Sequence, residues 1–81
     1  MSERGRLRWR CRRGTQELDR LLIGFLDQHG SQLTAGELAA FEGLLDNEDD
    51  DLVDWLINAQ GEPEDETSRA LVRRIRDHAL D

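Results

Sequence analysis

Three side chains of the kinds that catalyse reactions or bind soft metal ions stand far apart in this 81-residue sequence: Cys11, His29 and His78. A structural zinc site needs paired ligands such as Cys-x-x-Cys or His-x-x-x-His, and the sequence contains neither pair. Cys11 is the single cysteine, so it has no partner for an internal disulfide bond and no neighbouring histidine to activate it. A Gly-x-Gly-x-x-Gly loop, which would hold the phosphates of a dinucleotide, is also absent. These observations predict a protein that is not an enzyme and has no metal site or tightly bound cofactor.

The acidic run of residues 46–54 is a second candidate for chemistry, because calcium prefers carboxylate oxygens. An EF-hand loop beginning at Asp46 would need glycine at its sixth position and glutamate at its twelfth, and these positions hold Asp51 and Ile57. The start of a helix explains the run better, with Asp49 as the cap and acidic side chains in the first turn. Contact of this run with a basic partner surface stays open.

The third candidate is the junction at residues 12–19, which reads Arg-Arg-Gly-Thr-Gln-Glu-Leu-Asp. Two cations would end one helix, and Gly14 would supply the left-handed backbone of a helix stop. Thr15 or Gly14 would cap the next helix, and Glu17 and Asp19 would suit the positive end of its dipole. This structural interpretation explains the junction without a partner. A binding surface is the alternative that the residues leave open.

Apolar residues recur at helical spacing in four of the segments that must position these side chains. The four stripes are Leu18, Leu21, Leu22, Phe25 and Leu26; Leu38, Phe41, Leu44 and Leu45; Leu52, Val53, Trp55, Leu56 and Ile57; and Leu71, Val72, Ile75 and Ala79. Thr34 and Glu37 predict a capping box at the start of the second stripe. Gly30 and Gly61 are expected to end the first and third helices, and residues 61–66 form a polar connector. Gly24, inside the first stripe, predicts a kink or a close helix approach.

The first segment is ambiguous, because Leu7, Trp9 and Cys11 alternate with arginines at the period of a half-buried strand. The chain offers no second strand to pair with it, and an isolated strand cannot satisfy its backbone hydrogen bonds. We therefore interpret it as a helix, with Leu7 and Cys11 on one face and Trp9 to the side. The sequence predicts one all-α domain over residues 1–81, a small five-helix bundle in which residues 1–5 are flexible.

Charge is distributed unevenly along the chain, whose net charge is −7. Residues 1–20 carry seven arginines and three acids, whereas residues 21–66 carry thirteen acids and no lysine or arginine. Arginines interleaved with Trp9 could contact phosphates, but the acidic middle would repel a polyanion, so a nucleic-acid partner is disfavoured. The apolar run Leu21–Ile23 is far shorter than the roughly 20 residues of a membrane span, and no secretory signal precedes it. A charged protein partner in the cytoplasm is the expectation.

The junction resembles the R-G-x-x-E-L-D signature of the succinate dehydrogenase assembly factors that promote flavinylation. Further residues resemble the family in the same order along residues 6–78. They are Trp9-x-Cys11-Arg12, Leu44-Leu45, Asp51-Leu52-x-x-Trp55-Leu56, the Gly-x-Pro63 connector and the arginine-bearing last helix. The ordered set is more specific than the seven-residue motif alone.

The resemblance implies a small five-helix protein that binds the flavoprotein subunit of succinate dehydrogenase, and in bacteria also that of fumarate reductase. Such a protein assists covalent attachment of FAD to a histidine of that subunit, so the flavin is expected on the partner. The absence of a long N-terminal extension resembles a bacterial cytoplasmic member, and a monomer is expected because a single chain is adequate for a docking factor. An antitoxin-like or regulatory partner of a membrane-associated protein is the alternative, followed by a nucleic-acid-binding module.

The resemblance also implies which residues dock onto the flavoprotein. Arg13, Gly14 and Glu17 would form the docking surface, with Trp9, Arg12 and Asp19 as neighbours. A side chain at Gly14 would hold the partner backbone away, and Arg13 and Glu17 would make charge-assisted hydrogen bonds across the interface.

Overall fold

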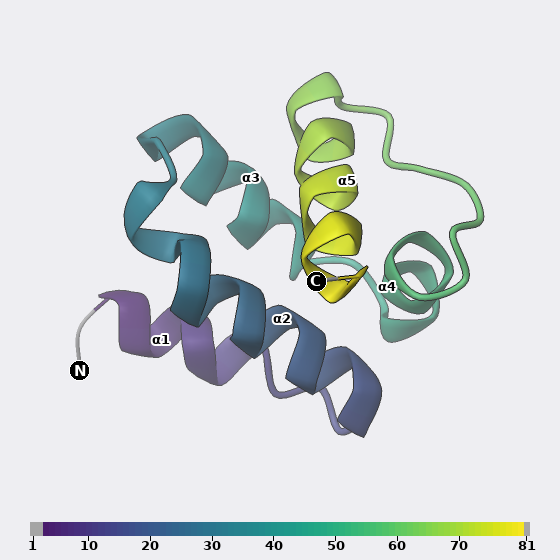
Figure 1. Cartoon of the computed structure of the whole chain (residues 1–81), viewed down its shortest axis with the longest axis horizontal. Helices are drawn as coiled ribbons and strands as arrows, with labels where there is room; N and C mark the ends of the chain where they lie inside the picture. Colours follow the sequence, from purple (N-terminus) through teal and green to yellow (C-terminus); the bar gives the residue numbers. More distant parts are fainter. Residues whose placement is uncertain (1–2, 81) are drawn as a thin grey trace.

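The computed structural model describes residues 3–80 of the chain, and the side chains of residues 5–79. These residues form five α-helices and one short 3₁₀ helix (Figure 1). The helices are α1 (Glu3–Arg10), α2 (Gln16–His29), η1 (Gly30–Gln32), α3 (Ala35–Leu44), α4 (Asp49–Leu56) and α5 (Glu66–Leu80). The predicted all-α fold is confirmed, and the ambiguous first segment is helical.

Helix α5 occupies the middle of the bundle, where it packs against α2, α3 and α4 (Figure 1). Helix α1 lies alongside α2, with Arg8 of α1 bonded to Asp27 of α2. The long connection between α4 and α5 arcs around the outside of the bundle (Figure 1). This arrangement brings the start of α2 and the ends of α4 and α5 to one side of the molecule.

Each of the five helices contributes to a single hydrophobic core, whose members are almost inaccessible to solvent. The buried residues are Leu7, Cys11, Leu18, Leu22, Phe25, Leu26, Leu33, Phe41, Leu44, Leu45, Leu52, Leu56, Leu71, Val72 and Ile75. The rings of Phe25 and Phe41 stack at its centre, 6.1 Å between centroids. The predicted stripes therefore face inward, and Trp9 lies off the stripe as expected, with 64% of its surface exposed. Ala79 departs from the prediction, because it is exposed at the end of α5.

The predicted capping box at α3 is confirmed. The Glu37 N–H donates to the Thr34 hydroxyl, and the Thr34 N–H donates to a Glu37 carboxylate oxygen at 2.9 Å. The bond from the Thr34 N–H, with smaller contributions from the Thr34 hydroxyl and Arg74, lowers the pKa of Glu37. Arg74 of α5 donates to the other Glu37 oxygen, so this cap also ties α3 to α5.

Both ends of α4, and the residues that follow α2, differ from the prediction. Helix α2 ends at His29 as expected, but Gly30 starts the 3₁₀ turn η1 instead of an open loop. Helix α4 ends at Leu56, five residues before Gly61, and the backbone then turns through positive φ at Ala59. Asp49 is the first residue of α4, and Glu48 holds the N-cap position. The predicted flexible segment, residues 1–5, falls partly outside the described residues, and residues 3–5 are the first turn of α1.

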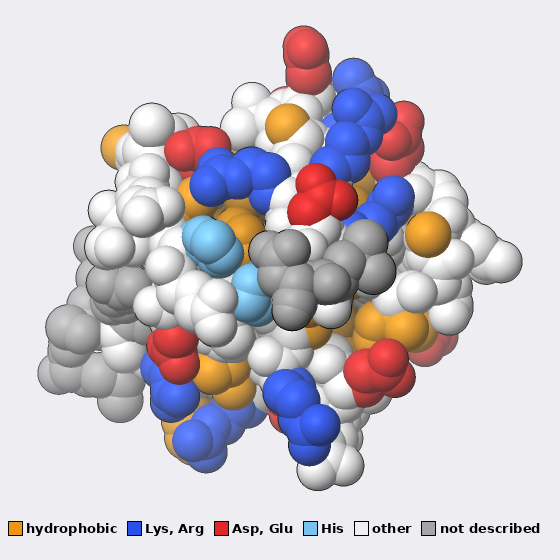
Figure 2. Space-filling model, in the orientation of Figure 1, with side chains coloured by type: hydrophobic (Ala, Val, Ile, Leu, Met, Phe, Trp, Pro, Cys, Tyr) orange, Lys and Arg blue, Asp and Glu red, His pale blue; other side chains and the backbone are white. Residues whose placement is uncertain are grey.

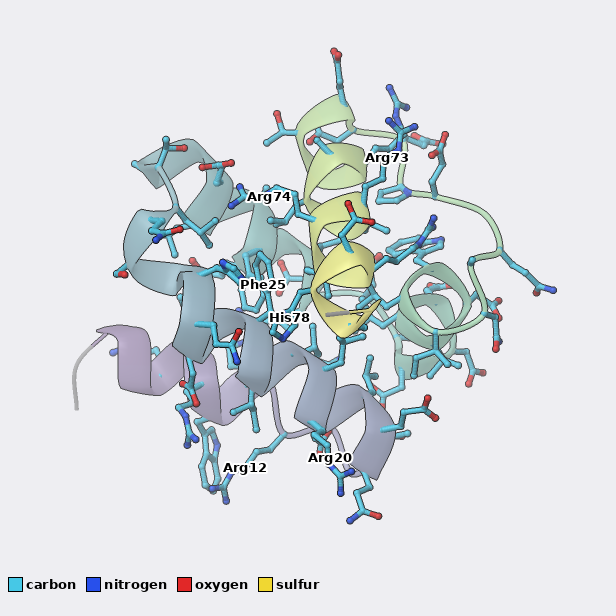
Figure 3. All side chains as sticks on the ribbon, in the orientation of Figure 1. Arg12, Arg20, Phe25, Arg73, Arg74 and His78 are labelled. Carbon is cyan, nitrogen blue, oxygen red and sulfur yellow. The ribbon has the colours of Figure 1, made fainter. Side chains whose placement is uncertain are left out.

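Gly24 lies where α2 and α5 approach closely. Of the two roles predicted for it, a kink or a close helix approach, the structure shows the close approach. A Cβ atom at Gly24 would lie 3.3 Å from Nε2 of His78. The His78 ring also meets the edge of Phe25, 5.9 Å between centroids, and the two side chains point toward each other in Figure 3. His29 packs against the same two rings, and both histidines appear together on one face of the molecule (Figure 2). The small glycine thus lets an aromatic cluster join the two helices.

Candidate functional site

The junction between α1 and α2 is a tight turn that the motif residues hold together themselves. Gly14 has φ +89°, a conformation that residues with a Cβ atom rarely adopt. One Asp19 carboxylate oxygen accepts the Arg13 N–H at 2.6 Å, and the other accepts the Gly14 N–H at 3.3 Å. Thr15 stands at the N-cap of α2 as predicted, but its side chain makes no capping bond. Asp19 therefore satisfies backbone groups of the turn that neither helix can satisfy.

Arg13 turns inward from this junction and is bonded within the chain. Its Nε donates to an Asp49 carboxylate oxygen at 2.8 Å, and its two terminal nitrogens donate to the Leu45 and Asn47 carbonyls, each at 2.7 Å. Only 16% of the Arg13 side chain is exposed. Asp49 is thus a partner of Arg13 and not the helix cap expected from the sequence. Because the three acceptors span the α3–α4 connection, Arg13 fixes the junction to the opposite part of the fold.

Cys11 lies beneath this junction as a packed core residue. Its side chain is inaccessible to solvent, and burial raises the pKa of its thiol to about 12, although Arg13 and Arg8 oppose the shift. A thiol with so high a pKa stays protonated at neutral pH and is a poor nucleophile. The interpretation of Cys11 as a small packed residue is confirmed.

Two arginines of α1 form ion pairs with acidic residues of other elements. Arg8 bonds to Asp27 at 3.1 Å, and Arg10 bonds to Asp46 at 2.6 Å. Both pairs are partly exposed, so solvent screens the attraction between their charges and they add little to stability. Basic and acidic side chains accordingly lie close together on the surface (Figure 2). These pairs place two arginines of the N-terminal helix against acidic side chains of α2 and of the α3–α4 connection.

Four of the six predicted partner-binding residues face solvent: Trp9, Arg12, Gly14 and Glu17. Trp9 is the exposed large hydrophobic residue of the described chain, and the Arg12 guanidinium lies over its ring, 5.6 Å from the centroid. A Cβ atom at Gly14 would meet no other atom within 4 Å, so the space outside the turn is open. We call these four residues the motif surface.

The six predicted residues thus have two kinds of environment. The motif surface is open to contact, whereas Arg13 and Asp19 bond to neighbouring parts of the same chain and set the shape of the turn. Binding by all six residues stays a prediction. The structure shows that Arg13 and Asp19 already form hydrogen bonds within the chain, without a partner.

A groove that the sequence did not predict lies next to Glu17, with a volume of about 640 Å³. It runs between the first half of α2, the end of α4 and the last turns of α5. The residues that matter most in its lining are Glu17, Arg20, Leu21, Ile57, Arg76 and Ala79. The clue in the sequence was Ala79, a small residue at the end of an apolar stripe, which leaves a hollow where a larger side chain would fill the space. We call this feature the α2–α5 groove.

Among residues 3–80, no three His, Cys, Asp or Glu side chains are grouped so that they could hold a metal ion. Within the same part of the chain, no helix is both long and apolar enough to cross a bilayer.

The fold and this surface define a class first: a small all-α bundle that buries its single cysteine and carries an exposed tryptophan on the helix before a tight glycine turn. The family follows from comparison with known proteins. Residues 5–79 match the model of a family described as the flavinator of succinate dehydrogenase. The chain therefore belongs to this family, whose members are assembly factors and not catalysts. The resemblance seen in the R-G-x-x-E-L-D motif is confirmed.

Individual relatives are similar over most of their length. The FAD assembly factor SdhE of Methylococcus capsulatus is 43% identical over 77 residues, which cover 94% of this chain and 90% of that protein. The protein of the same name from Pseudomonas aeruginosa is 43% identical over 76 residues, covering 94% and 89%. That of Legionella pneumophila strain Paris is 45% identical over 64 residues, covering 79% and 80%.

Proposed function

We propose that this chain binds the flavoprotein subunit of succinate dehydrogenase and assists the covalent attachment of FAD to it. The observation that carries the proposal is the match to the flavinator family over residues 5–79, in a chain that exposes the motif surface. The flavin stays on the partner, and the chain itself holds no FAD tightly. The chain supplies a surface that holds the flavoprotein in a conformation in which the subunit's own residues complete the bond.

In this proposal the six predicted partner-binding residues have different roles in docking. Trp9 and Arg12 offer an aromatic ring and a guanidinium that a partner would bury, and such residues dominate the binding energy of many interfaces. Gly14 lets the partner backbone come close to the turn, and Glu17 accepts hydrogen bonds from it. Arg13 and Asp19 act from behind, because their bonds hold the turn in the shape that docks.

The test of this function is the amount of covalent flavin on the flavoprotein subunit. Cells that lack this chain should show a large loss of in-gel flavin fluorescence after denaturation, and the intact gene should restore it. Normal fluorescence in the deletion strain would refute the proposal. Mixing the purified chain with the flavoprotein before flavinylation tests binding directly, by co-elution on a sizing column.

Three finer points belong to the same proposal. The chain also serves the flavoprotein of fumarate reductase, which pull-downs with each subunit would test. It acts as a monomer, since each described helix contributes to one core without a second chain, and light scattering would report the mass. It works in the cytoplasm, in keeping with relatives that come from bacteria, and fractionation would locate it.

A further inference from the structure

The α2–α5 groove combines an apolar floor with a locally positive rim. Leu21 and Ile57 are half-buried in it, and Ala79 is exposed at its edge. Its volume of about 640 Å³ lies within the range of pockets that bury a ligand or several side chains. The small Ala79 side chain leaves room for a larger apolar group from outside. The floor therefore suits an apolar side chain and not a bare ion.

The charges around the groove contrast with those of the whole chain. The protein carries a net charge of −7, yet the rim holds two arginines, Arg20 and Arg76, and one carboxylate, Glu17. Arg76 is anchored by donating to the Trp55 carbonyl at 2.5 Å. Arg20 is exposed and forms no hydrogen bond or ion pair with any group in residues 3–80, and it projects from the same edge of the molecule as Arg12 (Figure 3).

Arg20 favours a carboxylate at this rim, because a guanidinium binds carboxylates through charge-assisted hydrogen bonds. The first turn of α2 beside the groove already holds two carboxylates of the same chain, Glu17 and Asp19, so the attraction for a further negative group comes from Arg20 and Arg76. A cationic group of a partner would be repelled by these two arginines.

The groove is also continuous with the motif surface, because Glu17 belongs to both. A partner docked on Trp9, Gly14 and Glu17 has only to extend past Glu17 to reach the groove. This continuity selects the flavoprotein itself over a separate small molecule as the occupant.

We propose that the α2–α5 groove receives a segment of the flavoprotein in which a bulky apolar side chain stands next to an aspartate or glutamate. The apolar side chain enters between Leu21, Ile57 and Ala79, and the carboxylate binds Arg20 at the rim. This inference rests on the proposed function and extends the docking surface beyond the motif residues. The chain would then contact the flavoprotein at two neighbouring places, the motif surface and the α2–α5 groove, which share Glu17.

The experiment compares two tryptophan substitutions on one helix. Ala79→Trp fills the groove, whereas Ala70→Trp places the same side chain at an exposed position of α5 that does not line it. We expect Ala79→Trp to weaken binding to the purified flavoprotein about tenfold or more, and Ala70→Trp to leave it within about twofold, as for positions inside and outside an interface. Arg20→Glu should weaken binding by a similar factor, and Arg73→Glu on the outer side of α5 should not.

A photo-crosslinking residue at position 79 keeps the proposal testable if Ala79→Trp unfolds the chain. The crosslinked flavoprotein peptide should contain an apolar residue beside an acidic one, and the same probe at position 70 should give no product. No crosslink from position 79, or a peptide without a carboxylate, would overturn the inference. Equal binding by Ala79→Trp and the native chain would do the same.

The Gly14→Arg variant separates this inference from the proposed function. If the native chain binds the flavoprotein, Gly14→Arg does not, and Ala79→Trp binds normally, the function stands and the groove assignment fails. If the native chain itself does not bind, the proposed function fails, and the groove assignment fails with it.

Discussion

Two glycine turns in this molecule have similar backbones but differ in whether a tryptophan of the same chain covers them. Gly14 follows α1 with φ +89°, and Gly61 lies beyond α4 with φ +70°. Each turn has an arginine that donates to backbone carbonyls nearby or across the fold: Arg13 to Leu45 and Asn47, and Arg76 to the carbonyls of Trp55 and Gly61. In both turns a guanidinium supplies hydrogen-bond donors to backbone carbonyls that lie outside the helical hydrogen-bonding pattern.

The difference lies in the tryptophan beside each turn. A Cβ atom at Gly61 would lie 3.6 Å from the Trp55 ring, so this turn is covered by an aromatic residue of its own chain. Trp9 instead points outward with 64% of its surface exposed, and the space outside Gly14 is empty. The second turn is complete by itself, whereas the first has an exposed aromatic ring that a partner can cover. The contrast supports docking at Gly14 more specifically than charge does.

The largest expected effect comes from changing the two glycines. Gly14→Arg and Gly14→Ala force the same positive φ on a residue with a Cβ atom, which costs about 1–2 kcal/mol of stability in each case. Gly14→Arg should also weaken flavoprotein binding more than 100-fold, which is roughly 3 kcal/mol, because its side chain fills the docking space. Thermal melts and binding isotherms measure the two effects separately.

Gly61→Ala is the matched control, since it carries a similar backbone strain far from the motif. It should melt at a lower temperature and bind normally. Equal loss of binding in Gly14→Ala and Gly14→Arg would mean that the turn conformation alone matters, and not the open space outside it.

The next effect is on stability and compares the two arginines. Arg13→Ala removes a guanidinium that bonds a carboxylate and two carbonyls, and we expect a loss of about 2–3 kcal/mol in the free energy of unfolding. Arg76→Ala leaves two carbonyls without their donor, one of them bonded only at 3.4 Å, and should cost about 1–2 kcal/mol. Urea denaturation measures both values. A larger loss of stability for Arg76→Ala than for Arg13→Ala would show that other contacts hold the Gly14 turn in place.

The two tryptophans should have opposite roles, because Trp9 is expected to matter for binding and Trp55 for stability. Trp9→Ala should change the free energy of unfolding by less than about 0.5 kcal/mol, because the side chain is mostly exposed, and weaken binding about tenfold. Trp55→Ala should lower stability by about 1–3 kcal/mol and leave the intrinsic affinity unchanged. A Trp9 variant that binds normally would remove the aromatic ring from the docking surface.

The last and smallest effect concerns the pH dependence of stability and comes from Cys11, beneath the Gly14 turn. Its pKa in the folded chain is about 12, against an ordinary value of 9.0, so the unfolded chain releases this proton first as pH rises. Stability should therefore be unaffected below about pH 9 and should decrease between pH 9 and 12. Urea midpoints across this range, compared with those of Cys11→Ala, measure it. An equal decrease in both proteins would show that other groups cause it.

Local patterns predicted much of the fold, and long-range contacts account for what they missed. The stripe through Leu18 and Leu22 and the Thr34–Glu37 capping box depend on spacings of three or four residues, which can be read directly. The partners of Arg13 lie more than 30 residues away, so nothing near the motif shows that this side chain turns inward. The early end of α4 was missed because Gly61 suggested a helix stop, whereas the chain had already turned at Ala59.

The candidate site was predictable to a similar degree. The motif named the junction, whose role in docking stays a prediction, and the helical interpretation of the first segment placed Trp9 outside the core, as the structure has it. The sequence showed only the small Ala79 of the α2–α5 groove, because the groove forms where α2, the residue that follows α4 and the end of α5 come together, with Leu21, Ile57 and Ala79 in its lining. Only the packing of α5 across the bundle brings those residues together.

The inward course of Arg13 has a consequence for the time at which the protein becomes active during its own synthesis. The acceptors that hold the Gly14 turn belong to Leu45, Asn47 and Asp49, in the second half of the chain. A growing polypeptide that has left the ribosome only as far as α2 already carries the whole R-G-x-x-E-L-D motif but lacks every one of these acceptors. Under the proposed function, a chain that ends before residue 45 would carry the motif without the bonds that hold the Gly14 turn, and we expect it to bind the flavoprotein more weakly than the full chain does.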